Sequence, residues 1–387
     1  MNRKTCYRGL IVSFITVLAS CGGSSSDPVV NSSLPSPSPT PAVTTRSFYM
    51  GFSPWPYDAT AAAVLNTYTL IQDNGDIVSH HLMGGVPWQE AYTMAPLPNN
   101  LENTISTRVS QTQTNKVVYL SIDSLNAARN NLALNWGASE GEPLSAPWDT
   151  RNFADIEVAE AYSNFALSMI DRFKPAYFNY APEISELILN DIEKYNQFIT
   201  FSQRVYQTIK TAHPDLPLMV SVALKSPGSS DAQTIETHFS SLSDVVDVVG
   251  ISVYPYAFFE HADKGNPANL PANWLSQVST LAGSKPLAIT ESGWIAEDLS
   301  ITNYGYSEKS NPTLQSDFVS DLLDSSDKLS MEFVIWFSIV DYDSLWSNLL
   351  GEDDLSKLWK DTGLLDENLN NRPAFYIWQD YYSRDLN

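Results

Sequence analysis

The chain has 387 residues, a formal net charge of −22 at pH 7 and 12% aromatic residues, with ten Trp among them. A protein this acidic repels polyanions, so we expect no nucleic-acid partner and no sulfated or uronate-rich glycan as a substrate. The two cysteines, Cys6 and Cys21, both lie near the amino terminus. Disulfides, thiol nucleophiles and cysteine-ligated zinc are therefore excluded from the rest of the chain.

Residues 1–20 have the pattern of an export signal. Basic residues precede an apolar run from Leu10 to Leu18, which is too short to span a bilayer. The segment that ends at Cys21 resembles the lipobox of bacterial lipoproteins, in which cleavage precedes the cysteine and lipid is attached to it. We therefore expect lipid on Cys21 and anchoring in the bacterial cell envelope, at the outer membrane or the cell surface. The alternative is an ordinary secretory signal with a coincidental Cys.

Residues 21–46 are rich in Ser, Pro and Thr, which is typical of a semi-extended polar tether. Residues 47–387 follow without a second linker or a short-period repeat. This length exceeds that of most single domains but is usual for an α/β barrel. We therefore expect one folded domain, acting as a monomer.

From residue 48 onward, short apolar runs alternate with segments of helical period, a pattern that predicts a single (β/α)8 TIM barrel. The eight predicted strands are 48–52, 76–81, 116–122, 176–181, 217–223, 248–254, 286–291 and 333–339. The first helix is expected to be capped by Asp58 and ended by Gly75. The other predicted helices are 101–109, 153–173, 192–210, 272–282, 314–323 and 372–378.

Two glutamates stand at predicted strand ends, Glu183 after the fourth strand and Glu291 after the seventh. The carboxyl ends of the strands form the catalytic face of such barrels. Hydrolysis of a glycosidic bond needs two carboxyl groups, one to give a proton and one to attack the anomeric carbon or to activate water. Either glutamate could instead begin a solvated loop, and Glu186 is a nearby rival of Glu183.

The segments Glu183–Leu187 and Pro286–Trp294 resemble those of clan-A retaining glycoside hydrolases, such as arabinogalactan endo-β-1,4-galactanases and related endo-β-glycanases. The resemblance covers the whole barrel in order and is most specific at the last three strands. It implies that Glu291 is the nucleophile and Glu183 the acid/base. It also implies that Tyr254 hydrogen-bonds the nucleophile and that Trp336 floors the subsite for the reacting sugar.

The sequence departs from that family pattern just before Glu183, where Pro182 replaces the Asn that binds the sugar 2-hydroxyl. Asn179, which has the same strand parity as Glu183, is the candidate to compensate. An Arg expected after the second strand is also absent, and His80 and His81 occupy that region. These neighbours diverge on a strand, so one is expected to face the barrel mouth and the other the helices.

Further candidates for sugar binding lie at or near predicted strand ends, although any of the aromatic residues could instead pack in the core. The full set of candidate substrate-binding residues is Tyr254, Trp336, Trp294, Asn179, His80, Trp88 and Asp341. No His-x-x-x-His spacing or suitably spaced carboxylate points to a metal. We therefore expect neither a metal nor an organic cofactor.

The sequence thus predicts a lipid-anchored retaining glycoside hydrolase that cleaves a neutral β-linked polysaccharide by double displacement. The sugar and the linkage are left open. A non-catalytic glycan-binding lipoprotein on a degenerate barrel is the alternative, favoured by Pro182. Metal-dependent hydrolysis at His80 and His81 is a third possibility with little support.

Overall fold

The computed structural model describes residues 45–387. The predicted signal peptide, Cys21 and all but the last two residues of the predicted tether lie outside this range. Among residues 45–387, no helix combines the length and the hydropathy needed to cross a bilayer.

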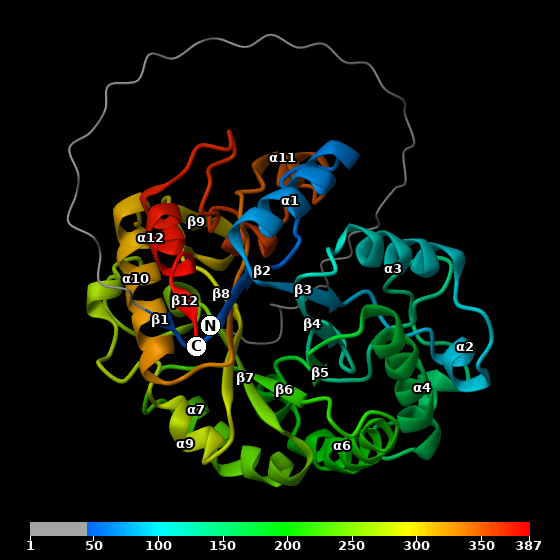
Figure 1. The fold of residues 1–387 in the computed structure, drawn as a ribbon. Helices are drawn as coiled ribbons and strands as arrows, with labels where there is room; N and C mark the ends of the chain where they lie inside the picture. Colours follow the sequence, from blue (N-terminus) through cyan, green and yellow to red (C-terminus); the bar gives the residue numbers. More distant parts are fainter. Residues whose placement is uncertain (1–44) are drawn as a thin grey trace, which may run out of the picture.

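Eight parallel strands close into a barrel in the order β11-β2-β3-β4-β5-β6-β7-β8, and helices surround it (Figure 1). The predicted TIM barrel is therefore confirmed, with each strand within a few residues of its predicted position. The strands are β2 (Tyr49–Phe52), β3 (Ile77–Leu82), β4 (Val117–Ile122), β5 (Tyr177–Ala181), β6 (Leu218–Ala223), β7 (Val248–Val253), β8 (Leu287–Ser292) and β11 (Phe333–Trp336).

The outer layer is formed by α1 (Ala61–Asn74), α3 (Asn99–Gln111), α4 (Ile156–Phe173), α6 (Ile192–Ala212), α7 (Ser230–Phe239), α9 (Val278–Ala282), α10 (Pro312–Lys328) and α12 (Pro373–Tyr382). Helix α1 begins two residues later than expected because Thr60, and not Asp58, accepts the Ala63 N–H at 3.2 Å. The sequence did not predict α7, which buries only Ile235 and Phe239.

Shorter elements lie in the connections that leave the carboxyl ends of the strands and rim the barrel mouth. They are α2 (Trp88–Thr93), η2 (Trp148–Thr150), α5 (Ser185–Asn190), α8 (Pro255–Phe258), η4 (Pro267–Asn269), β9 (Leu299–Ile301), η5 (Thr302–Tyr304), β10 (Tyr306–Glu308), α11 (Asp343–Asn348) and η6 (Ser356–Trp359). One further turn, η3 (Ser240–Val245), leads into β7 at the opposite end.

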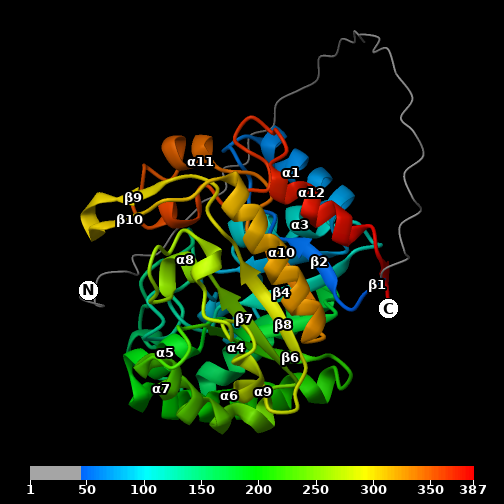
Figure 2. The same cartoon turned by 90° about the vertical axis from the view of Figure 1, so that its left-hand side faces the viewer.

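The two ends of the described chain meet at the pole opposite the mouth. There β1 (Thr45–Arg46) pairs in parallel with β12 (Asp385–Leu386), far from the hairpin β9–β10 in Figure 2. Arg46 is buried and its guanidinium pairs with Asp76 at 2.7 Å. The last residues assigned to the tether therefore belong to the folded domain.

Strand alternation divides the core into two layers. Side chains such as Ile77, Tyr119 and Phe333 fill the barrel interior, while their strand neighbours pack between the sheet and the helices. The same alternation determines which side chains point toward the mouth where each strand ends. A bulge in a strand interrupts the alternation.

Candidate active site

The two predicted catalytic glutamates lie together in a cavity of about 30 Å³ at the carboxyl end of the barrel. Hydroxyl groups dominate its wall. The full lining is Ser53, Ser79, His81, Tyr119, Ser121, Arg129, Pro182, Glu183, Ser221, Ser252, Thr290 and Glu291.

Glu291 reaches this cavity because of a bulge in β8. Ala288 points into the barrel and Ile289 points toward the helices, so simple alternation would turn Glu291 outward. The register against β7 passes from Ile289 directly to Glu291, which leaves Thr290 as the extra residue. Thr290 and Glu291 therefore both line the cavity. Bulges commonly re-aim side chains at barrel rims and active sites.

Tyr254, at the end of β7, donates its hydroxyl to Oε1 of Glu291 at 2.5 Å. Burial raises the pKa of Glu291 to about 7, with a further contribution from the neighbouring Glu183 carboxylate. The Tyr254 hydrogen bond and the charges of His81 and Arg129 oppose this increase. Burial also holds the pKa of Tyr254 well above its usual value, so its hydroxyl remains a donor.

Glu183 follows β5 and is held from several sides. Its backbone is left-handed, with φ +53°, a conformation that side-chain-bearing residues rarely adopt and that clusters at functional sites. The Glu183 N–H donates to Oγ of Ser221 at 2.9 Å, and Ser252 donates its hydroxyl to Oε1 of Glu183 at 2.9 Å. Nη2 of Arg129 lies 3.5 Å from Oε2 of Glu183.

A chain of charged groups extends from Glu183 to the neighbouring strands. Nη1 of Arg129 donates to Oδ2 of Asp123 at 2.8 Å, and Oδ1 of Asp123 lies 2.7 Å from Nε2 of His81. Burial alone would raise the pKa of Asp123, but the charges of Arg129 and His81 lower it below its ordinary value. The sequence did not identify Arg129, because its position in a loop does not reveal its partners.

Phe337, just beyond the end of β11, is partly exposed, whereas Trp336 is not. Trp336 is fully buried on the helix side and donates its indole N–H to the Thr362 carbonyl at 2.9 Å. The Phe337 ring makes edge contact with Tyr342, at 6.3 Å between ring centres. The structure thus does not bring Trp336 to the site.

Three partly exposed aromatic rings stand near the catalytic groups. The Phe337 ring centre lies 5.5 Å from that of Trp55, and the Trp359 ring centre lies 5.8 Å from that of Tyr254. A Cβ on Gly293, next but one to Glu291, would lie 2.8 Å from the Phe337 carbonyl oxygen and 3.0 Å from the Tyr254 ring. Phe337 and Trp359 were not among the candidates identified from the sequence.

The fold sends His80 and His81 to opposite faces of β3, as strand alternation requires. His81 lines the cavity, whereas His80 is completely buried and its Nε2 contacts Oγ1 of Thr112 at 2.7 Å. Burial, reinforced by the Arg108 charge, lowers the pKa of His80 to about 3. His80 is therefore a neutral core residue, and the histidine next to the catalytic groups is His81.

Trp88 and Trp294 are also fully buried and do not reach the cavity. Trp88 donates its indole N–H to the Ala133 carbonyl at 3.0 Å. Trp294 donates to the Gly265 carbonyl at 3.3 Å and stacks on Phe318 at 4.5 Å between ring centres. Both expectations of sugar contact fail because the indoles pack beneath the loops.

Asn179 and Asp341 are likewise enclosed by protein. Asn179 lies inside the barrel, where it donates to the Tyr119 hydroxyl at 2.9 Å and accepts the Ala181 N–H at 3.0 Å. Its amide is thus already paired and does not take the place of the Asn missing at Pro182. Asp341 is buried against Arg372 at 2.7 Å. Burial raises the pKa of Asp341 well above its usual value, although Arg372 opposes the increase.

Two groups of carboxylates in residues 45–387 are close enough to share a cation, and neither includes Glu183 or Glu291. They are Glu297 with Asp341 and Glu367, and Asp341 with Asp343 and Asp361. The first group contacts Arg372 and the second contacts Lys360. Each group thus already has one cation of the protein beside it, which offsets part of its negative charge.

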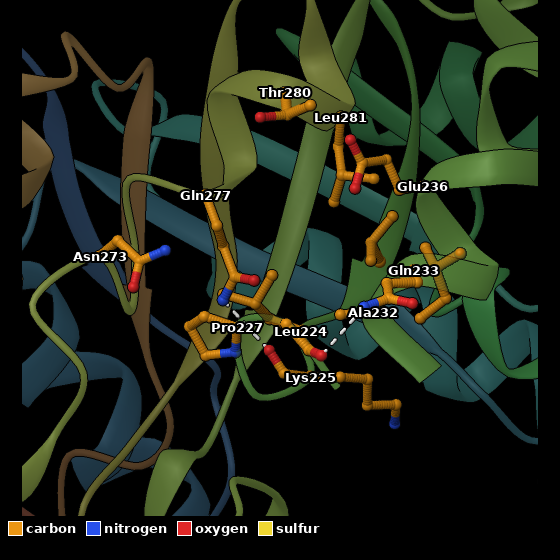
Figure 3. A pocket seen from close by; sticks show the side chains of 13 residues that line it. Leu224, Lys225, Pro227, Ala232, Gln233, Glu236, Asn273, Gln277, Thr280 and Leu281 are labelled. Carbon is orange, nitrogen blue, oxygen red and sulfur yellow. Dashed lines mark hydrogen bonds between the residues drawn. The ribbon is translucent and has the colours of Figure 1, made fainter. Parts of the chain in front are cut away.

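A larger cavity of about 220 Å³ lies outside the barrel between α7 and α9 (Figure 3). Its lining mixes apolar side chains with amides such as Gln233 and Gln277, and Glu236 is its one carboxylate. Because it lacks a second carboxyl group, this cavity does not offer the pair that glycoside hydrolysis requires.

No protein-family model and no curated protein matches the chain. Solved structures do match it. An exo-β-1,4-mannosidase from Opitutaceae bacterium strain TAV5 gives a TM-score of 0.59 at 14% identity, covering 89% of this chain and 60% of the mannosidase. The chain therefore spans less than two thirds of that enzyme.

Two further matches cover more of the other protein. The GH53 catalytic domain of Ignisphaera aggregans gives a TM-score of 0.58 at 15% identity, covering 87% of this chain and 97% of that domain. A GH5_18 protein from Bifidobacterium longum subsp. infantis gives a TM-score of 0.60 at 11% identity, covering 89% of this chain and 80% of that protein. These neighbours confirm the fold expected from the clan-A resemblance, and the chain has the (β/α)8 barrel that these glycoside hydrolases share.

Proposed function

We propose that the protein is a retaining glycoside hydrolase that cleaves a β-linked neutral polysaccharide. The observation that carries this proposal is the meeting of Glu183 and Glu291 in one cavity, with Tyr254 donating to Glu291. Two carboxyl groups at the mouth of a barrel are the machinery that such hydrolysis needs. No cofactor enters the reaction.

The first step breaks the glycosidic bond. Glu183 gives its proton to the glycosidic oxygen while a carboxylate oxygen of Glu291 attacks the anomeric carbon, forming a covalent glycosyl-enzyme and releasing the leaving sugar. In the second step Glu183 takes a proton from water. The water oxygen attacks the anomeric carbon, and Glu291 leaves as a carboxylate.

The electrostatics of the pair support this sequence of proton transfers. Because burial and Glu183 raise the pKa of Glu291 to about 7, the two carboxyl groups together retain one proton close to neutral pH. One proton is the number that the first step consumes. The Tyr254 hydroxyl favours the ionised form of Glu291, which is the form that attacks.

A neutral glycan is favoured by the surroundings of the pair. Trp55, Phe337 and Trp359 are partly exposed, and flat aromatic rings pack well on the apolar faces of sugars. The net charge of −22 disfavours polyanionic chains.

The test is release of reducing sugar from a panel of neutral β-glycans, such as galactan, glucan, mannan and xylan. We expect the wild type to cleave at least one, and Glu183→Gln and Glu291→Gln to lose at least about 10²-fold in rate. Glu236→Gln, in the other cavity, is the matched control and should keep full activity. Equal activity in all three variants would refute the two-carboxylate mechanism.

Retention is tested separately by following the anomeric protons of the first product by NMR. Double displacement predicts a β-anomer as the initial product. An initial α-anomer would mean that water attacks directly and that Glu291 acts as a base. Azide should also restore activity to Glu183→Ala by attacking the glycosyl-enzyme, giving a β-glycosyl azide.

A non-catalytic glycan-binding role is the second candidate, and Pro182 is the observation that favours it. Proline offers no side-chain donor where a sugar hydroxyl contact is expected, and the Asn179 amide is engaged in the barrel interior. Binding of a glycan without cleavage, with affinity unchanged in both glutamine variants, would support this role over catalysis.

We further propose that the protein acts as a monomer, held in the bacterial cell envelope by lipid on Cys21. The basis is the segment from Leu18 to Cys21 and the Ser/Pro/Thr-rich stretch that follows it. Labelling of the expressed protein with a radioactive fatty acid should be lost in Cys21→Ala. Equal labelling of both forms would exclude Cys21 as the attachment site.

A further inference from the structure

We propose that Arg129 is a positioning residue that holds Glu183 and stabilises its carboxylate once the proton has been given to the leaving oxygen. The catalytic part of this inference, an effect on proton donation, rests on the proposed function. The electrostatic part, an effect of the Arg129 charge on the Glu183 carboxylate, rests on the contacts of Arg129 and is tested in the absence of substrate.

The guanidinium of Arg129 bridges two carboxylates. Nη1 lies 2.8 Å from Oδ2 of Asp123, and Nη2 lies 3.5 Å from Oε2 of Glu183. The Arg129 side chain is only 8% exposed, whereas that of Glu183 is 25% exposed. A buried cation beside a more accessible carboxylate can act on that carboxylate while leaving it open to a substrate.

The position of Arg129 is set by several elements. Asp123 at the end of β4 binds it from one side and is itself paired with His81 from β3. The turn that carries Arg129 is closed by its N–H, which donates to the Asn126 carbonyl at 2.8 Å. Asn190, at the end of α5, donates to the Arg129 carbonyl at 3.4 Å. Because α5 begins at Ser185, the Arg129 turn is joined to the helix that follows Glu183.

Double displacement requires Glu183 to alternate between its acid and its carboxylate form. An adjacent cation favours the carboxylate and so makes proton donation easier. Asp123 competes for the same guanidinium, which limits this effect and allows Glu183 to regain a proton. Since Arg129 and His81 keep the pKa of Asp123 low, Asp123 remains ionised throughout the working range.

The environment of Glu183 explains why a residue from a distant loop is needed. Pro182, which precedes it, has no polar side chain, and the remaining side-chain donor to its carboxylate is the uncharged Ser252. The other titratable side chains around Glu183 are Glu291, His81, Tyr119 and Tyr254, and among them Glu291 is the one that can carry a like charge. Arg129 is the cation that lies next to the Glu183 carboxylate itself, whereas His81 is joined to it through Asp123.

The experiment is a ¹³C NMR titration of the glutamate carboxyl groups in the folded domain, with the Glu183 signal assigned through Glu183→Gln. We expect Arg129→Met to raise the pH midpoint of Glu183 by about one unit. Asp123→Asn should lower the midpoint, because it leaves the guanidinium charge to Glu183 alone. Arg151→Met, which removes a surface partner of Glu157, is the matched control and should change nothing.

The two variants with opposite expected signs guard against a general loss of structure, which would move both midpoints in the same direction. An unchanged Glu183 midpoint in Arg129→Met, or a rise in both variants, would overturn the proposal. If the midpoints move as expected but no glycan is cleaved, the electrostatic role stands and the proposed hydrolase function fails.

Where turnover is found, kinetics test the catalytic part. Arg129→Met should lower kcat on a natural glycan about 10-fold or more with little change in KM. It should affect an aryl glycoside with an acidic leaving group much less, because that leaving group departs without a proton. Equal losses on both substrates would refute a role in proton donation. Arg129→Lys, which keeps the charge, should recover part of kcat.

Discussion

Tyr254→Phe removes a single hydroxyl group that donates to Glu291 at 2.5 Å and leaves the ring in place. In the productive form of the pair, Glu291 is ionised and Glu183 carries the proton. The hydroxyl stabilises this form relative to the alternative in which the proton lies on Glu291. A hydrogen bond to a charged group contributes about 1.5–3 kcal/mol. Since 1.4 kcal/mol corresponds to a factor of ten, the productive form should fall by about 10- to 100-fold.

The assay is kcat/KM against pH on the glycan that the wild type cleaves, together with the NMR titration of Glu291. We expect kcat/KM to fall about 10- to 100-fold at its optimum. The midpoint at which the pair loses its last proton should rise above the wild-type value of about 7. The sign follows because the doubly ionised pair loses a stabilising donor.

The packing of the Tyr254 ring separates the loss of the hydroxyl from a loss of structure. Tyr254 lies in edge contact with Tyr256 and Trp359, and these contacts do not involve its hydroxyl. The thermal stability of Tyr254→Phe should therefore stay close to that of the wild type. Unchanged kcat/KM with an unchanged Glu291 midpoint would refute the reasoning, because both effects depend on the same hydrogen bond.

Three further predictions concern individual side chains. The pKa of Glu291 is raised in the fold, so the wild type should lose stability as the pH rises from about 4.5 to 7. In urea titrations above pH 7, Glu291→Gln should be up to about 3 kcal/mol more stable than the wild type, and equal stability of the two proteins there would contradict this. Phe337→Ala should raise KM about 10-fold by removing an aromatic contact, whereas Trp88→Phe should leave KM unchanged in the same assay. Arg372→Met should lower the free energy of unfolding by about 3–5 kcal/mol at pH 7, because it leaves Asp341 buried without its partner, and a loss below 1 kcal/mol would contradict this.

The barrel could be predicted from the sequence because each strand has a local signature. The apolar run from Leu287 to Ile289 indicates a strand buried on both faces, and Glu291 at its end indicates the catalytic face. The first-helix cap was misplaced from Thr60 to Asp58, since both are good N-cap residues within two positions of each other.

Whether a strand side chain points into the barrel or toward the helices was harder to predict than the positions of the strands. Phe333 to Phe337 is apolar at every position, so no alternation marks which residues point inward, and Trp336 was chosen in place of Phe337. The bulge at Thr290 likewise leaves no signal in the sequence. Glu291 was identified from its position at a strand end and from the family resemblance, and the bulge turns its side chain into the cavity.

Contacts that depend on loops were beyond local reasoning. Arg129 meets Glu183 across 54 positions of sequence, through a turn closed on Asn126. The buried state of Trp88 and Trp294 was also hidden, because an indole after a strand suits either a sugar platform or the packing beneath a loop.

The short parallel pair between β1 and β12 has a practical consequence for handling this protein. Thr45 lies opposite Asp385 and Arg46 opposite Leu386, so β1 and β12 run side by side, far from the hairpin β9–β10 (Figure 2). An affinity label or a surface coupling attached next to β1 or β12 would lie on the same side of the domain, away from a polymer that approaches the barrel mouth. The same geometry suits circular permutation, because a short peptide joining β1 to β12 should be tolerated. The new termini could then be placed in an exposed connection between a strand and a helix.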